Sequence, residues 1–139
     1  MGKFVLKNAD IVVNGQNISN WVREVAVETE RDVVELTGFQ AANKEKGAGL
    51  GDGRMTMEVM QDMAAGAINA LLWPLSSSDT PFTVAVKAQT GAKSPTNPSF
   101  EMQALLFNYS PIQGAVGDAA TTPVTFENAS PAGITQVTA

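Results

Sequence analysis

The 139-residue sequence contains no histidine and no cysteine. Histidine is the commonest general base near neutral pH, and cysteine supplies thiol nucleophiles, disulfides and, together with histidine, most zinc ligands. Their absence excludes most hydrolase and thiol chemistry. We therefore expect a protein that is not an enzyme, with no catalytic residues, no metal ligands and no cofactor.

Basic residues are also few: 9 lysines and arginines stand against 14 acidic residues, which gives a net charge of −5 and a pI of about 4.6. Proteins that grip nucleic acid phosphates carry the opposite balance. Charged residues make up 17% and hydrophobic residues 44% of the chain. This composition favours a globular fold, and the length fits one domain over residues 1–139.

Long hydrophobic runs are missing as well. The apolar residues after Lys3 are interrupted by Lys7, so the run is far too short for a signal-peptide core or a membrane span. We expect no membrane contact and a protein that stays where it is made.

Short segments of alternating apolar and polar residues dominate the chain and predict about seven or eight strands. The Asn14-Gly15 pair predicts a tight hairpin turn, because both residues tolerate positive φ. The predicted strands include residues 3–7, 10–13, 23–36, 54–62, 82–86, 100–109 and 122–126. The pattern favours a mainly β fold: an antiparallel β-sandwich or barrel with one flanking α-helix.

The single predicted helix begins at Asp62, which can cap it, and ends at Pro74, which disfavours helical geometry at the residue before it. Its apolar residues follow the spacing of one buried face. They are Ala64, Ala67, Ile68, Leu71, Leu72 and Leu75. The methionines Met55, Met57, Met60 and Met63 and the tryptophans Trp21 and Trp73 are expected in the core.

A glycine-rich segment over about residues 37–53 is long for a loop in a compact domain, and such loops are usually functional or disordered. It matches neither the dinucleotide-binding nor the phosphate-loop motif. It is either a flexible hairpin tip or a loop that docks on a neighbouring subunit. In the second case the contacts would come from Phe39 and Leu50 as apolar anchors and from Lys44, Lys46 and Arg54 as partners for acidic residues. Residues 129–139, rich in Ala, Pro and Thr, are expected to form an extended C-terminal arm.

Three acidic residues, Glu24, Glu28 and Glu30, alternate along one predicted strand and so share one face. They could form a solvated outer face, a carboxylate pair or a calcium site. They could also line a space that must not bind a polyanion, since carboxylates repel phosphates.

The order of these features resembles the major tail tube proteins of long, non-contractile phage tails. The resemblance rests on Ile11-Val12-Val13-Asn14-Gly15 continuing to Trp21-Val22, on the acidic strand Val25 to Glu30, on Met57-Glu58-Val59-Met60-Gln61-Asp62 running into Leu71-Leu72-Trp73-Pro74-Leu75, on Phe82-Thr83-Val84, and on Val116-Gly117-Asp118 before Val124-Thr125-Phe126. It spans nearly the whole chain.

The resemblance implies a subunit that self-assembles into hexameric rings, which stack into a tube in the virion tail. DNA would pass through the lumen without specific binding, and Glu24, Glu28 and Glu30 are the candidates to face it. The implied partners are other copies of the chain, a tape-measure protein, a terminator and tail-tip proteins, with assembly in the host cytoplasm. The contrasting hypothesis is a monomeric β-sandwich that binds to or decorates a virion or cell surface.

Overall fold

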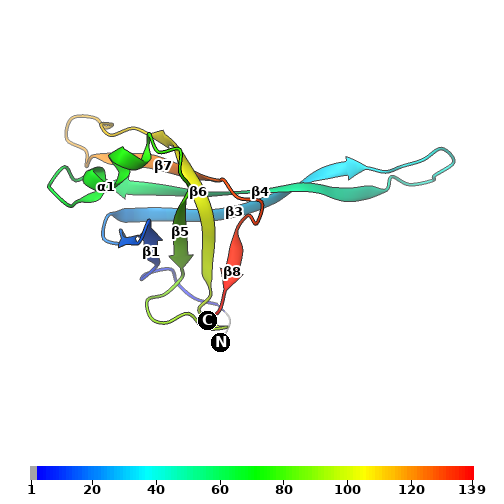
Figure 1. The fold of residues 1–139 in the computed structure, drawn as a ribbon, viewed down its shortest axis with the longest axis horizontal. Helices are drawn as coiled ribbons and strands as arrows, with labels where there is room; N and C mark the ends of the chain where they lie inside the picture. Colours follow the sequence, from blue (N-terminus) through cyan, green and yellow to red (C-terminus); the bar gives the residue numbers. More distant parts are fainter. Residues whose placement is uncertain (1–2) are drawn as a thin grey trace.

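The computed structural model describes residues 3–139, which contain eight strands and one helix (Figure 1). The strands are β1 (Asp10–Val13), β2 (Gln16–Asn17), β3 (Val22–Glu35), β4 (Lys46–Met60), β5 (Phe82–Lys87), β6 (Ser99–Tyr109), β7 (Thr121–Asn128) and β8 (Thr135–Val137), and the helix is α1 (Ile68–Leu75). All the strand pairs are antiparallel. The predicted mainly β fold with one flanking helix is confirmed.

One sheet, in the order β2-β1-β5-β6-β7-β4-β3, contains the strands, and β8 pairs with β6 outside this path. Strand β6 holds the two halves of the sheet together: its first half pairs with β5 and its second half with β7. A register shift between Leu106 and Asn108 interrupts the pairing with β7. The sheet therefore folds over on itself, so that β5 and β6 run across the direction of β3 and β4 (Figure 1).

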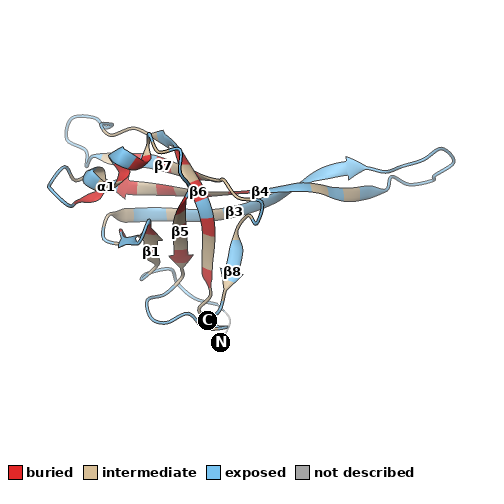
Figure 2. Cartoon of the chain, in the orientation of Figure 1, coloured by how far each residue is buried: buried red, intermediate tan, exposed pale blue. Residues whose placement is uncertain are grey.

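The core fills the space between the two halves of the sheet and is closed on one side by α1 (Figure 2). Alternate residues of β4, Met55, Met57 and Val59, point into it. The rings of Phe82 and Phe126 meet edge to face, with centroids 5.8 Å apart and an interplanar angle of 85°. Burial of this apolar surface is the main force that stabilises the fold.

Local turn chemistry follows the sequence at the first hairpin. Asn14 and Gly15 have φ values of 50° and 81°, the pairing that a type I′ turn between β1 and β2 requires. Residues 3–7 differ from the prediction: they have no regular secondary structure, since no strand within the described chain pairs with them.

The helix also differs from its prediction, because it begins at Ile68 and not at Asp62. Asp62 accepts hydrogen bonds from the backbone of Ala64 and the indole of Trp21, and Gly66, with φ of 77°, separates this turn from the helix. Pro74 lies inside the last turn of α1 instead of ending it. Ile68, Leu72 and Leu75 are buried, whereas the expected core residues Trp73, Met60 and Met63 are exposed.

The glycine-rich segment is not one long loop. Strand β4 begins at Lys46, so its glycines lie in a strand that pairs with β3 as far as the Glu35–Lys46 pair. Together these strands form a long β-hairpin whose outer part projects from the body as an arm (Figure 1). We call residues 31–51 the arm and residues 36–46 its tip.

The C-terminal segment, expected as an extended arm, folds back on its own chain. β8 pairs with the first residues of β6 through Ser99, Phe100 and Glu101, and Ile134 packs against the core. The eight-residue α1 is the one helix in residues 3–139, and it does not have the length and apolar character needed to cross a membrane.

Candidate assembly surfaces

The outer face of the β3–β4–β7 half is acidic. Residues directly opposite one another on paired strands share a face of the sheet. The pairs that carry charge are Glu24–Glu58, Glu28–Arg54, Glu30–Asp52 and Arg54–Glu127. They place carboxylates from β3, β4 and β7 on the side of the sheet away from the core. The acidic face therefore carries Glu24, Glu28, Glu30, Asp52, Glu58 and Glu127.

Arg54 holds part of this face together. Its Nη1 donates to Oε2 of Glu28 at 3.2 Å and its Nη2 to Oε1 of Glu30 at 2.9 Å, while Asp52 lies 3.9 Å away. The hydrogen bonds to Glu30 and then to Glu28 raise the pKa of Arg54. These pairs are solvent-exposed, so they orient the side chains more than they stabilise the fold.

A second group on the acidic face surrounds Glu58. A hydrogen bond with the side chain of Glu24, followed by one with Thr121, lowers the pKa of Glu58. These side chains border an open depression of about 400 Å³ between β3, β4 and β7, with Gln113 and Pro123 at its rim. Among residues 3–139 no group of three or more carboxylates is arranged to hold a metal ion.

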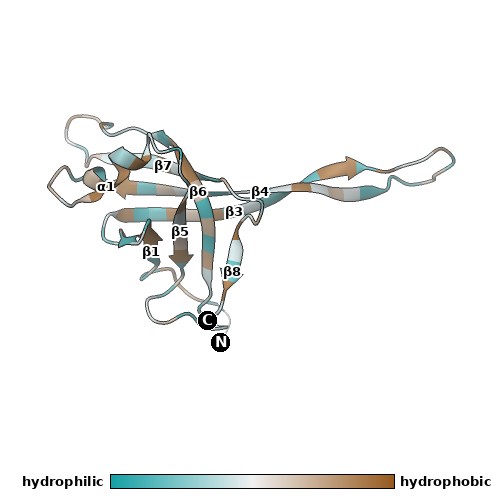
Figure 3. Cartoon of the chain, in the orientation of Figure 1, coloured by the Kyte–Doolittle hydropathy of each residue, from teal (hydrophilic) through white to brown (hydrophobic). Residues whose placement is uncertain are grey.

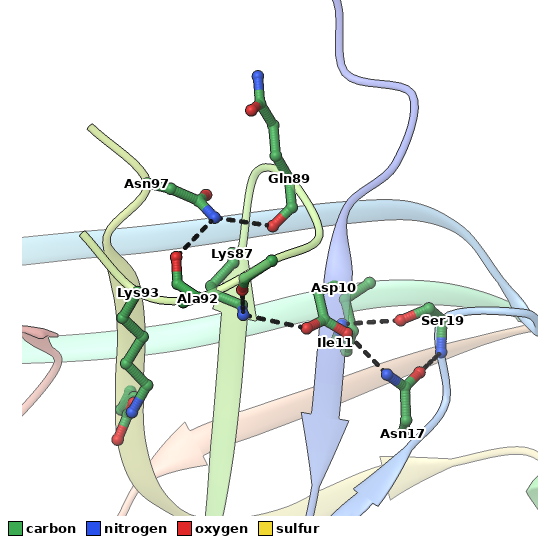
Figure 4. Close-up of polar contacts among 11 residues, drawn as sticks. Asp10, Ile11, Asn17, Ser19, Lys87, Gln89, Ala92, Lys93 and Asn97 are labelled. Carbon is green, nitrogen blue, oxygen red and sulfur yellow. Dashed lines mark hydrogen bonds and ion pairs between the residues drawn. The ribbon is translucent and has the colours of Figure 1, made fainter. Parts of the chain in front are cut away.

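The outer face of the β1–β5–β6 half differs, because its charges are paired (Figure 4). Lys87 forms an ion pair with Asp10 at 3.2 Å and also donates to the carbonyl of Gly91, and Lys93 pairs with Glu101 at 2.6 Å. Burial opposes ionisation of Glu101, but hydrogen bonds from Lys93 and Ser99 lower its pKa.

Two asparagines add hydrogen bonds beside this face, one between β2 and β1 and one within the loop before β6. Asn17 donates to Asp10 at 2.7 Å, and Asn97 donates to the carbonyls of Gln89 and Ala92 (Figure 4). Lys87 and Lys93 thus bind the loop before β6 to β5 and β6, and the charges of both lysines are neutralised within the chain.

The arm exposes apolar side chains on both of its strands. Val33, Leu36, Phe39 and Leu50 are all exposed, and Phe39 has no part of its side chain covered. Figure 3 shows the hydrophobic stretch at the end of β3. Lys44 and Lys46 are exposed at the tip. An exposed apolar surface of this kind is typical of a site that contacts a partner.

Hydrogen bonds give the tip a defined shape. The backbone N–H of Leu36 donates to the carbonyl of Glu45 at 2.8 Å, and the N–H of Glu45 donates to the Thr37 hydroxyl at 2.7 Å. On β4 the alternate glycines at 47, 49, 51 and 53 lie on one face. A Cβ at Gly49 would stand 3.0 Å from Cβ of Asp32 and 3.1 Å from Cγ2 of Val34, so β3 packs closely over this face.

The structure separates the residues that the sequence grouped as an inter-subunit loop. Phe39, Lys44, Lys46 and Leu50 lie on the arm, whereas Arg54 lies on the acidic face, paired with Glu28 and Glu30 of its own chain. Glu24, Glu28 and Glu30 do share one exposed face. Sequence reasoning missed Asp52, Glu58 and Glu127. The alternation of residues 54–62 could have suggested Glu58, but only the pairing of β4 with β3 and β7 brings these residues together.

No protein-family model and no curated protein matches the sequence. Solved structures do share its fold. A chain of the sheath–tube complex of the PVC extracellular contractile injection system, in the extended state, superposes with a TM-score of 0.70 over 99% of this chain and 93% of its own, at 12% identity.

The chain has a tail-tube-like fold. Two structures of a gene transfer agent support the same conclusion. A chain of the native virion superposes with a TM-score of 0.67 over 94% of this chain and 95% of its own. A chain from the tail of the empty particle, determined with C6 symmetry, gives 0.66 over 94% of each chain, and both are 12% identical to this sequence. The resemblance to tail tube proteins is thus confirmed in the fold, across nearly the full length of both partners.

Proposed function

We propose that this protein is the structural subunit of a phage-like tail tube, in which copies of the chain form hexameric rings that stack into a hollow polymer. The observation that carries the proposal is the superposition of the whole chain on tube and tail subunits, one of them in a sixfold-symmetric tail. Long, non-contractile phage tails are the proposed setting, and the virion is the proposed location, after assembly in the host cytoplasm.

In this tube the acidic face lines the lumen. Its carboxylates, including Glu24, Glu28 and Glu30, repel the phosphates of DNA and keep the genome from adhering to the wall during ejection. Arg54 holds Glu28 and Glu30 in place on this wall, because its guanidinium bridges their carboxylates.

The free edge of β3 provides a route to ring closure. Strand β3 pairs with β4 on one side, and within residues 3–139 no strand pairs with its other side over fourteen residues. An unpaired edge of this length favours addition of another strand, and closing a ring of sheets removes such edges. A tape-measure protein inside the tube, a terminator at one end and tip proteins at the other complete the proposed set of partners.

Electron microscopy of the purified protein tests the proposal directly. Concentrated protein in negative stain is expected to form hollow tubes of uniform diameter, with sixfold symmetry in end-on views. A preparation that contains only small particles at every concentration would instead support the alternative, a monomeric β-sandwich that decorates a virion or cell surface.

A further inference from the structure

A second exposed apolar surface lies at the end of the molecule opposite the arm (Figure 1). A depression of about 370 Å³ is bordered by Met63, Pro111, Ile112 and Ala115. Ile112 is 87% exposed, and Met63 is more than half exposed. Isolated exposed apolar residues are ordinary, but several around one depression indicate a surface that is covered in an assembly.

The walls of this depression are held in place within the chain. The Gln61 side chain donates to the carbonyl of Pro111 at 2.6 Å and to the Tyr109 hydroxyl at 3.0 Å, and its backbone N–H donates to the carbonyl of Ala120 at 2.9 Å. The Tyr109 hydroxyl in turn donates to Asn69. The depression is therefore formed before any partner arrives, which lowers the entropic cost of binding.

The arm tip is complementary to this depression in both polarity and charge. The tip presents the fully exposed ring of Phe39 and the exposed side chain of Leu36. Asp118 borders the depression and no lysine or arginine lines it, whereas the tip carries Lys44 and Lys46 against one glutamate. An apolar anchor beside two lysines thus matches a largely apolar socket with one carboxylate at its border.

We propose that the arm tip of one copy docks in the depression of a second copy, with Phe39 seated against Ile112 and Met63. The two surfaces differ and lie at opposite ends of the molecule, so the contact is heterologous and does not close on itself, and it extends the assembly along one axis. This inference rests on the proposed function, since it assigns the contact through which successive rings of the tube stack.

Engineered cysteines test the contact, because the protein has none of its own. The Phe39→Cys and Ile112→Cys variants are mixed in equal amounts, assembled and oxidised. Disulfide-linked dimers are expected on a non-reducing gel. The control pairs Phe39→Cys with Thr96→Cys, an exposed position in the loop before β6, and is expected to give no dimer. Tubes that form without the Phe39–Ile112 cross-link, or with equal cross-linking in the control, overturn the docking proposal alone.

A charge substitution provides an independent measurement. Phe39→Asp and Ile112→Asp are each expected to raise the protein concentration needed for polymerisation by at least about tenfold, as for the loss of an interface anchor. Thr96→Asp should leave it unchanged. Because neither anchor is covered in its own chain, the thermal midpoint of the monomer should not move. Normal assembly of either anchor variant overturns the docking proposal, and failure of the unmodified protein to polymerise overturns the proposed function itself.

Discussion

Leu72→Ala paired with Trp73→Ala tests how α1 packs on the sheet. The two residues are adjacent in α1, but Leu72 is 0% exposed within the core, whereas Trp73 is 58% exposed. Truncating a fully buried leucine removes its transfer free energy and leaves a cavity, which costs about 2 to 5 kcal/mol. Truncating a largely exposed side chain usually changes stability by about 0.5 kcal/mol or less.

Urea unfolding of the unassembled protein, followed by far-ultraviolet circular dichroism, measures both changes. With a denaturant slope of about 2 kcal/mol per M, Leu72→Ala should lower the unfolding midpoint by about 1 to 2.5 M, and Trp73→Ala should leave it nearly unchanged. The slope itself should stay constant, since the fold is the same. Equal shifts for the two variants, or none for Leu72→Ala, would refute the packing of α1 described above.

Three further predictions address the charged faces and the arm. Glu28→Lys should make assembled tubes retain DNA, with retention falling steeply as salt rises, whereas Asp79→Lys, away from the acidic face, should not; equal retention would contradict a lumenal Glu28. Lys93→Met removes the partner that lowers the pKa of Glu101, so the thermal midpoint of the variant should lie below that of the unmodified protein at neutral pH. The difference between the two midpoints should narrow as the pH drops below 4.5. A difference that stays constant with pH would exclude a role for Glu101 ionisation. Gly49→Val crowds Asp32 and Val34 and should impair polymerisation without lowering the melting temperature, whereas Ala48→Val, on the opposite face of β4, should assemble normally.

The sign of the Glu101 prediction follows from its direction of shift. A carboxyl group whose pKa is lower in the folded than in the unfolded state stabilises the fold above its ordinary pKa, and that stabilisation is lost as the pH falls through the folded value. The Lys93→Met variant lacks this contribution, so its fold is less stable than that of the unmodified protein only at pH values at which Glu101 is ionised. Calorimetry over a series of pH values provides the comparison.

Local features of the sequence were sufficient to predict several individual turns, strands and helices. The Asn14-Gly15 turn, the alternation of residues 54–60 and the apolar spacing of residues 68–75 each depend on neighbours within a few positions, and the structure contains the corresponding turn, strand and helix. The predicted start of α1 was wrong because Asp62 has the side chain of a helix cap, and the sequence alone does not show what else that side chain binds. In the structure its carboxylate binds Trp21, forty-one positions away, as well as Ala64.

The full set of residues on the acidic face could not be predicted from the sequence, because it depends on contacts between residues far apart in the chain. The sequence placed Glu24, Glu28 and Glu30 on one face, since a strand alternates, but it could not show that Glu58 and Glu127 join them or that Arg54 pairs with Glu28 and Glu30. These facts follow from strand register, and a shift of one residue would turn every side chain to the other face.

The glycine-rich segment shows the same division between local and tertiary information. By itself the sequence determined that residues 37–53 are flexible in composition, apolar in part and unlike a nucleotide-binding loop. Only the tertiary structure decided that its second half is a strand, because the glycines of β4 lie opposite residues of β3 on both sides of a register shift between Arg31 and Val33. Gly53 and Gly51 pair with Thr29 and Arg31 before the shift, and Gly47 pairs with Val34 after it. Backbone conformation depends on near neighbours, whereas strand partners and register are set by the global burial of Met55, Met57 and Val59 in a core that residues from the whole chain build together.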